Sequence, residues 1–337
     1  MAMAVTIKDV ARESGVNIST VSRALNNGYG VNPETRELVV AVANRLQYRP
    51  NRVARGLVTG RSHSLALIIS DIRNPFFADV ARGAADAARA DNCDLVLCNS
   101  DMDPVRQMEY VRSLLEKRVD GILMNSVAAL TPEEQKQLAD FGVPIVLLNR
   151  SPASRAFSTV SADNEGGGAL AAQHLLDLGH RNVAHITGPR QHGNLSDRTR
   201  GFVETLLRAA RPVTPVVLHG AFHFEGGREL TNKLLDQHPG ITAIFAANDV
   251  MACGAVRAIL DRGLRIPEDL SLIGFDNIDF ASIIHPPLTT IHQPKYEMGR
   301  AAVEILLRLS RDKTRRTPES RILGVELIER QSCRRRS

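Results

Sequence analysis

A short segment near the N-terminus carries side chains suited to reading the edges of DNA bases. Val21 and Ala24 recur at helical spacing and predict a helix with one buried face. Ile18, Ser19 and Arg23 then point outward near the start of that helix, where a recognition helix contacts DNA. An arginine can bind a guanine edge through two hydrogen bonds, and an isoleucine can pack on a thymine methyl group. The segment therefore predicts direct readout of duplex DNA.

Short polar side chains surround this outward face and suit contacts with phosphates. Such contacts fix the register of a protein on DNA but carry no sequence information. The predicted phosphate contacts are Asn17, Thr20, Ser22 and Asn26. Thr6 and Tyr48 complete the DNA contacts that we predict in this region. The alternative interpretation is a small three-helix domain that packs without binding DNA.

Three short helices must position these groups. Thr6 and Asp9 form a T-x-x-D pattern, which is typical of a capping box, and Gly15 supplies the break for a tight turn. Asn17 can cap the second helix, and Asn32-Pro33 can open the third. The apolar stripe of the third helix is predicted to be Leu38, Val39, Val42, Ala43 and Leu46. Residues 1–46 are thus predicted to form a helix-turn-helix head.

Charge is concentrated at the N-terminal end of the chain. Residues 1–61 hold nine basic and four acidic side chains, whereas the rest of the chain holds 33 of each. A basic head on a neutral body suggests a polyanionic partner, although a solvated basic surface would explain the charge by itself. Residues 47–61 are basic and contain a proline and two glycines, so we predict a hinge there.

After Arg61, short apolar runs alternate with alanine-rich helical stretches. This alternation is typical of parallel sheets covered by helices on both faces. The strand candidates are 65–70, 95–99, 121–125, 145–149, 183–187, 216–218, 243–246 and 270–274. The helix candidates are 78–91, 104–117, 165–178, 226–237 and 249–261. We therefore expect an α/β body made of two doubly wound subdomains, and a disordered tail at Arg334–Arg336.

Several classes of protein are disfavoured by what the sequence lacks. The four cysteines form no CxxC pair and no zinc spacing with histidines, so we expect free thiols and neither a metal nor another cofactor. The N-terminus lacks the apolar stretch of a signal peptide, and the apolar runs are far shorter than the ~20 residues of a membrane helix. We expect a soluble cytoplasmic protein without a membrane partner. The sequence has no P-loop, nucleotide-binding glycine loop or GxSxG elbow, so we expect no enzyme.

The head and hinge closely resemble those of the lactose-repressor family of bacterial regulators, in the runs TIKDVARESGVNISTVSRALN and VNPETRELVVAVANRLQYRPNRVARGL. The resemblance continues to about residue 330 through NPFFADVARG, EKRVDGILM, HLLDLGHRNVAHITGP, TAIFAANDVMACGA, RIPEDLSLIGFDNIDFA and PPLTTIHQPKYEMGRAA. It implies a homodimer on near-palindromic operator DNA. It also implies hinge helices that insert Leu57 into the minor groove, beside Ala54, Asn51 and Arg52.

Two neighbouring aromatic residues suit a sugar-like ligand. Such a ligand needs flat apolar surfaces for its C–H faces and planar polar groups for its hydroxyls. Phe76 and Phe77 follow Asn74-Pro75 just after a predicted strand end, which is where open α/β sheets bind ligands. The alternative is that both phenylalanines belong to the core.

The body also resembles the ribose type of periplasmic sugar-binding proteins, of the type I fold. The resemblance implies effector contacts from Asn74, Phe76, Phe77, Arg150, Arg198, Phe222, Asn248, Asp276 and Gln293. Where the ribose-type pattern has an aspartate before the arginine, this sequence has Asn149, whose amide also donates. Ribose or a related pentose leads as the effector, and a hexose, a polyol or a nucleoside stays open. Asn248 and Asp276 could instead be turn residues.

We predict that the two subdomains exchange segments. The N-terminal effector subdomain is predicted to combine 62–161 with 293–322, and the C-terminal one to combine 162–292 with 323–337. The sequence after Leu327 has no leucine heptads, which favours a dimer over a tetramer. The alternative function is a sugar-binding protein or receptor with no regulatory role.

Overall fold

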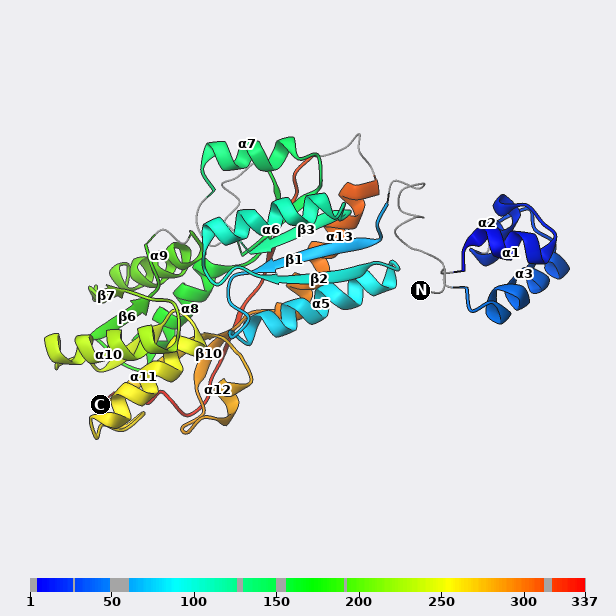
Figure 1. Ribbon diagram of the computed structural model, residues 1–337. Coiled ribbons are helices and arrows are strands. Elements are labelled where there is room, and N and C mark those ends of the chain that lie inside the picture. The colour runs from blue at the N-terminus through cyan, green and yellow to red at the C-terminus, as the bar shows by residue number, and fades with distance from the viewer. Residues whose placement is uncertain are drawn as a thin grey trace. The chain divides into compact units, whose positions relative to one another are not determined.

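The computed structural model describes residues 5–26, 28–48, 61–125, 130–149, 156–190, 193–311 and 317–336, without the side chains of residues 193 and 194. The chain divides into two compact units, Met1–Ser62 and His63–Ser337 (Figure 1). Among the helices of these described residues, none has the length and apolar composition that a bilayer span requires.

The first unit, the head, consists of three helices: α1 (Ile7–Ser14), α2 (Ile18–Leu25) and α3 (Pro33–Arg45). The predicted start and stop signals are confirmed. The Asp9 carboxylate accepts hydrogen bonds from the backbone N–H and the hydroxyl of Thr6, at 2.9 and 2.7 Å. Gly15 ends α1 with a φ of 69°, a left-handed conformation that glycine adopts without a steric cost. Asn17 and Asn32 cap α2 and α3 through hydrogen bonds from Thr20 and Thr35.

Apolar side chains from all three helices form the core of the head. Val10, Val21 and Val39 are completely buried at its centre. Leu38 was predicted to join the apolar stripe of α3, and this is wrong because its side chain is 49% exposed. It stands one position before Val39, about 100° around the helix, and Val39 occupies the position that faces the core.

The second unit, the body, contains two six-stranded sheets (Figure 1). The first has the order β11-β5-β4-β3-β1-β2, and all its strand pairs are parallel. Its strands are β1 (Ser64–Ile69), β2 (Asp94–Asn99), β3 (Gly121–Asn125), β4 (Ile145–Leu148), β5 (Ser158–Ala162) and β11 (Ser320–Leu323). Its helices are α5 (Phe76–Ala90), α6 (Pro104–Glu116), α7 (Pro132–Asp140) and α13 (Lys295–Arg311).

Both faces of the first sheet are buried, which explains the continuous apolar strands. Leu65 and Leu67 of β1 pack against α5 and α13, whereas Ala66 and Ile68 pack against α6 and α7. α5 and α13 are far apart in the sequence but lie side by side (Figure 1). Alternate side chains of one strand thus serve two cores, as expected for a doubly wound sheet.

The second sheet has the order β12-β10-β9-β8-β6-β7, with β12 antiparallel to β10. Its strands are β6 (Val183–Thr187), β7 (Val216–His219), β8 (Ala243–Ala246), β9 (Ser271–Asp276), β10 (Thr289–His292) and β12 (Glu326–Ile328). Its helices are α8 (Asn164–Asp177), α9 (Gly193–Leu207), α10 (Phe224–Gln237), α11 (Asp249–Asp261) and α12 (Phe280–Ile283). The α/β class and the two doubly wound sheets are therefore confirmed.

The chain passes between the two sheets three times. It leaves the first sheet from β5 to α8, returns from β10 to α13, and passes again from β11 to β12. We call these the first, second and third passages. They fall close to the predicted subdomain boundaries, which themselves stay predictions.

Several elements were not predicted, and one expectation was wrong. Strands β5, β10, β11 and β12 and helices α7, α9, α12 and α13 were missing from the candidates. The expected disorder of the tail is contradicted. The backbone N–H of Arg334 donates to Ser271 Oγ at 3.1 Å, and that of Arg336 donates to the Leu178 carbonyl at 2.7 Å. The tail is ordered because its backbone groups find acceptors on β9 and at the end of α8, which a run of arginines does not reveal.

Candidate functional site

The outward face of α2 presents the side chains that were predicted to read base edges. Ile18 is 44% exposed, and Ser19 and Arg23 are exposed as well. The Arg23 Nε–H donates to the Ser19 carbonyl at 3.3 Å, which lays the side chain along its own helix. The three residues thus lie together on the first two turns of α2, the arrangement that direct readout needs.

The other arginines of the described head are held by protein groups. Arg12 pairs with Asp9 and Arg45 with Glu13, each at 2.7 Å. Arg36 donates to the Ala24 and Gly28 carbonyls, at 3.2 and 3.0 Å, and so satisfies backbone groups near the end of α2. Within residues 5–26 and 28–48, Arg23 is the arginine whose side chain has neither an ion pair nor a hydrogen bond to another element.

The predicted phosphate contacts also serve as structural groups. Asn17 Oδ1 accepts from the Thr20 N–H at 2.8 Å and from the Ser19 hydroxyl at 2.6 Å. Asn26 Nδ2 donates to the Ser22 carbonyl at 2.7 Å. Tyr48 packs half-buried against the core of the head, and this burial raises its pKa. The predicted contacts Asn51, Arg52, Ala54 and Leu57 lie outside the described residues.

The body encloses a cavity of about 420 Å³ between its two sheets, at the carboxyl ends of their strands. Seven of the predicted effector contacts line it: Asn74, Phe76, Phe77, Asn149, Arg198, Phe222 and Asp276. Parallel strands bring their carboxyl ends to one edge of a sheet, so these residues meet although they are distant in sequence. Arg150, another predicted contact, lies outside the described residues.

Aromatic rings form the apolar wall of the cavity. Phe76 and Phe77 begin α5 and pack edge to face, with their ring centroids 5.1 Å apart and an angle of 87° between the rings. Both are largely buried and also belong to the core of the first sheet. The two interpretations of these residues are therefore compatible. Phe222 stands on the opposite side, after β7.

A buried ion pair forms the polar floor of the cavity. Arg198 of α9 and Asp276 at the end of β9 lie 3.7 Å apart, with side chains 2% and 4% exposed. Burial lowers the pKa of Arg198 to about 10, which still leaves it charged at neutral pH. Burial raises the pKa of Asp276 to about 6, although Arg198 and Lys295 act to lower it. These two charges are held where a ligand hydroxyl can donate to one and accept from the other.

Three residues of the lining, Met102 with a φ of 61° among them, have backbone conformations that residues other than glycine rarely adopt. Asn149 has a φ of 53° and Asp276 a φ of 109°. Asn149 Oδ1 is buried without a hydrogen-bond partner. Strained backbones are often found where a side chain must be aimed at a ligand. A ligand donor would satisfy the Asn149 oxygen.

Asn248 and Gln293 were predicted to contact the effector, but they do not line the cavity. Asn248 caps α11, with its Oδ1 accepting from the Met251 N–H at 2.8 Å. Gln293 Nε2 donates to Asp276 Oδ1 at 2.5 Å, so it supports the pocket carboxylate from behind. Asn248 Nδ2 and Gln293 Oε1 have no hydrogen-bond partner in the described structure.

A second buried carboxyl group, Asp249, was missed by the sequence analysis. It accepts from the Thr290 hydroxyl at 2.6 Å and from the Ile278 N–H at 2.9 Å. Burial and the nearby Asp276 raise its pKa to about 8. Its signal in the sequence was only an aspartate after Asn248, a position that a helix N-terminus also explains.

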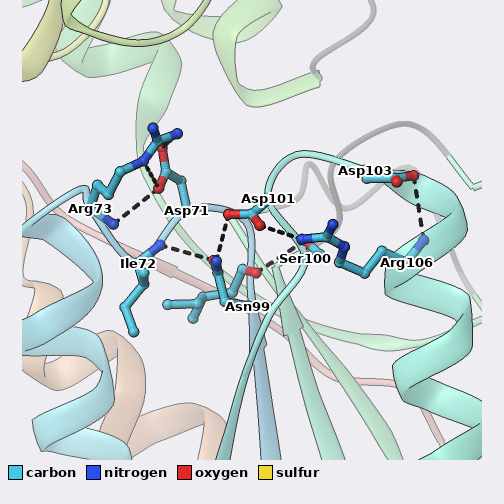
Figure 2. Close-up of polar contacts among 9 residues, drawn as sticks. Asp71, Ile72, Arg73, Asn99, Ser100, Asp101, Asp103 and Arg106 are labelled. Atoms are coloured by element: carbon cyan, nitrogen blue, oxygen red, sulfur yellow. Dashed lines mark hydrogen bonds and ion pairs between the residues drawn. The ribbon is translucent and has the colours of Figure 1, made fainter.

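Charged residues at the mouth of the cavity were also missed. Arg73 binds both carboxylate oxygens of Asp71 at 2.9 Å, and the Ile72 N–H donates to Asn99 Oδ1 at 2.9 Å (Figure 2). Asn99 in turn donates to Asp101, which pairs with Arg106. His223 and Glu225 line the facing side. The other lining residues missed are Ser70, Met102, Asn125, Leu195, Phe224 and Val250. In the part of the chain that the structure describes, no group of His, Cys, Asp and Glu could hold a metal ion.

Comparisons with known proteins bear on both units. The model of the family "Bacterial regulatory proteins, lacI family" matches residues 6–51, and that of the "Periplasmic binding protein-like domain" matches residues 172–333. The chain is 36% identical to the catabolite control protein A of Priestia megaterium, over 93% of this chain and 94% of that protein. It is 37% identical to the ribose operon repressor of Halalkalibacterium halodurans, over 90% and 89%.

Solved structures share the same fold. The lac repressor dimer bound to operator and the anti-inducer ONPF superposes with a TM-score of 0.87, at 30% identity over 98% of this chain and 99% of that chain. A lacI-family regulator from Enterococcus faecium with bound ribose has a TM-score of 0.74, at 32% identity over 81% and 100%. The related proteins are transcriptional regulators rather than enzymes. The chain therefore belongs to the lacI family of DNA-binding bacterial transcriptional regulators.

Proposed function

We propose that this protein is a repressor that binds a near-palindromic operator as a homodimer and responds to a small sugar-like effector, with D-ribose or a related pentose leading. The observation that carries the effector is the cavity of about 420 Å³, with phenylalanines on one wall and the Arg198–Asp276 pair on its floor. This size and this mixture of apolar walls with a few polar groups are typical of small-molecule sites.

The charges around the cavity favour an uncharged ligand. Asp71, Glu225 and Asp276 line it together with Arg73, Arg198 and His223. Within the described lining, Arg73 is held by Asp71 and Arg198 faces Asp276, so each of these arginines already has a carboxylate beside it. Neutral hydroxyl groups can both donate to the carboxylates and accept from the arginines. A free sugar therefore suits the site better than a sugar phosphate.

Ribose leads because a ribose operon repressor is among the relatives and a similar regulator was solved with ribose. The catabolite control protein A is related at nearly the same identity, so overall similarity does not select the effector. Asn149 replaces the aspartate of the ribose-type pattern, so other pentoses, hexoses, polyols and nucleosides must be tested as effectors beside ribose.

Thermal unfolding of the full-length protein with each of these sugars tests the effector. A ligand at about 100 times its Kd adds about 2.7 kcal/mol of stability. We expect D-ribose or another pentose to raise the melting temperature and its 5-phosphate to leave it unchanged. Stabilisation by the phosphate alone would contradict an uncharged effector, and no stabilisation by any of the sugars would contradict the sugar-like class.

The edge of the first sheet offers a surface for a second copy of the chain. β2 is the last strand in the sheet order, and its Val96 and Leu97 are 39% and 42% exposed. An uncovered apolar edge strand is an association hazard unless a partner covers it. We expect Leu97→Asp to lower the dimer fraction in sedimentation. The matched control is Ile322→Asp, on β11 at the opposite edge and 55% exposed. Equal dimer fractions in the two variants would contradict a dimer contact at β2.

Selection from random duplex DNA tests operator binding. We expect the enriched sequences to be near-palindromes and to bind far more tightly than random DNA at the same salt concentration. A sugar-binding protein without a regulatory role would enrich no sequence. That result would contradict DNA readout by the exposed face of α2.

A further inference from the structure

The side chain of Asn164 connects the cavity to the first passage between the sheets. Asn164 is the first residue of α8, two positions after β5 ends at Ala162, and it is only 4% exposed. Its Nδ2 donates to the Ala162 carbonyl at 3.0 Å, and its Oδ1 accepts from Arg198 Nε at 2.8 Å. One amide therefore joins the end of β5, in the first sheet, to Arg198 on α9, a helix that packs on the second sheet.

Arg198 depends on this partner for its orientation. Its Nη1 donates to the Ala247 carbonyl at 2.5 Å, and its guanidinium carbon lies 3.7 Å from the centre of the Phe275 ring. Its Nη2 donates to no protein group among the described residues. With Nε and Nη1 engaged, Nη2 is the group that remains for a ligand in the cavity that Arg198 lines.

The helices that carry the two residues cannot slide independently. A Cβ atom at Gly168 of α8 would lie 2.1 Å from the Arg198 carbonyl oxygen. A Cβ atom at Gly201 of α9 would lie 1.9 Å from the Glu165 carbonyl oxygen. The two backbones are thus in direct contact at two points close to the Asn164–Arg198 hydrogen bond. A ligand that shifts Arg198 must also shift the start of α8.

The other charge of the cavity is tied to a different passage. Gln293, which follows β10, donates to the Asp276 carboxylate at 2.5 Å. Lys295 Nζ donates to the Asp276 carbonyl at 2.9 Å and lies 3.8 Å from Asp79 Oδ2 on α5. Arg198 is therefore connected directly to the first passage through Asn164, whereas its connection to the second passage runs through Asp276.

We propose that Asn164 is a positioning residue of the effector site, which aims Arg198 at the ligand through Oδ1 and links ligand binding to the first passage through Nδ2. This rests on the proposed function, because it requires an effector in the cavity. The amide of Asn164 can accept through Oδ1 and donate through Nδ2 at the same time. An aspartate at this position keeps the acceptor and loses the donor, and an alanine loses both.

Two variants of the full-length protein separate these two roles, with D-ribose as the probe and the selected operator as the DNA. Asn164→Ala should weaken ribose binding by about ten-fold or more, because the hydrogen bond to a charged group is lost. Asn164→Asp should bind ribose within about three-fold of the parent protein. In Asn164→Asp, the ratio of the ribose affinities measured without and with operator, which reports the coupling between the two sites, should fall towards one. The matched control is Asn232→Ala, which removes an amide that accepts from Arg262 Nε at 2.9 Å on the surface.

A second readout needs no ligand. The Nε–H resonance of Arg198, identified by its loss in Arg198→Lys, should shift and exchange faster with water in Asn164→Ala than in Asn232→Ala. Asn164→Asp keeps the acceptor, so its Arg198 resonance should stay protected. If Asn164→Ala does not fold, loss of this protection in Asn164→Asp would contradict the aiming role.

The outcomes are distinct. Ribose binding by Asn164→Ala equal to that of Asn232→Ala, or an Arg198 resonance in Asn164→Ala equal to that in Asn232→Ala, would overturn the aiming role. Full coupling in Asn164→Asp would overturn the link to the first passage. A parent protein that binds neither ribose nor any other sugar of the thermal series would instead overturn the proposed function, while the resonance still tests the aiming of Arg198.

Discussion

The head and the body hold their recognition groups in opposite environments. Ile18, Ser19 and Arg23 stand exposed on a helix that is held by its caps, a small core and a hydrogen bond from Arg36. Arg198 and Asp276 are buried, and each is oriented by several protein partners. An exposed side chain can adapt to a hydrated DNA groove, whereas a buried charge must be held in place because water cannot solvate it. Conformational freedom suits the first kind of binding, and fixed geometry suits the second.

The difference also predicts how each site responds to salt. Contacts between the head and DNA release counterions, so operator affinity should fall steeply as salt rises. The pocket charges are shielded from solvent and lie next to each other, so sugar affinity should change little. The predictions below test this contrast, and they begin with the largest expected effect.

Arg198→Ala should abolish the sugar response, with a loss of at least about 100-fold in affinity, because it also leaves Asp276 buried without its cation. Operator binding should stay intact, because Arg198 belongs to the body. Sugar titration and operator binding measure the two effects. The control is Arg200→Ala. It removes an exposed arginine of the same helix as Arg198, which pairs with Glu165 of α8 and Asp197 of α9. A full sugar response in Arg198→Ala would remove the basis of the contrast.

Arg23→Ala should reduce discrimination between operator and random DNA by about 10- to 100-fold, because a two-pronged contact with guanine contributes about 1–3 kcal/mol. Sugar affinity should not change. Competition binding at one salt concentration measures the ratio. Arg45→Ala removes another exposed arginine of the head, paired with Glu13, and should weaken all DNA equally if it has any effect. Equal discrimination in the two variants would show that α2 does not read bases through Arg23.

The buried Asp249 should make the body less stable as the pH rises. Burial raises its pKa to about 8, so between pH ~4 and ~8 the folded protein retains a proton that the unfolded chain has released. Stability therefore falls as the pH rises through this window, by at most about 1.4 kcal/mol per pH unit. Asp276 contributes with the same sign up to about pH 6. Denaturant unfolding of the parent and of Asp249→Asn between pH 5 and 8 should show a smaller slope in the variant, and parallel curves would contradict the burial effect.

Asn149→Asp should change the sugar preference by about five- to ten-fold, since a hydrogen bond to a charged acceptor exceeds a neutral one by about 1 kcal/mol. We expect D-ribose to gain affinity relative to D-xylose. The ratio of the two affinities is the measurement, because any general loss of stability cancels in it. Asn125→Asp, which makes the same substitution in the cavity lining at the end of the neighbouring strand β3, is the matched comparison. An unchanged ratio in Asn149→Asp would indicate that residue 149 does not contact the sugar.

Local signals predicted the elements that they specify. The caps of α1, α2 and α3 were recognised because Asn17, Asn32 and the Thr6/Asp9 pair act within three residues of themselves. Continuous apolar runs identified the interior strands except β5 and β10, whose buried serines and threonines interrupt the apolar pattern. The edge strands β11 and β12 were missed, since they are short and half-exposed and carry polar residues. The tail was misjudged because its order comes from backbone hydrogen bonds to distant partners.

The candidate site divides in the same way. Its aromatic wall and its ion pair were predicted, because strand ends and the family resemblance point to them. The supporting residues Asn164, Asp249 and Lys295 were not, because nothing in their local sequence indicates which buried group they contact. Asn248 and Gln293 were expected to contact the ligand, and the structure places them behind the lining instead.

The sequence by itself determined the two kinds of recognition surface, because helical and strand periodicity, caps and charge are properties of neighbouring residues. It determined that α2 would expose an arginine and an isoleucine, and that a parallel α/β body would follow. Only the tertiary structure decided which side chains share the cavity and which stand behind it. Those assignments depend on burial and on hydrogen bonds between residues such as Asn164 and Arg198, which are 34 positions apart and meet only when α8 and α9 pack together.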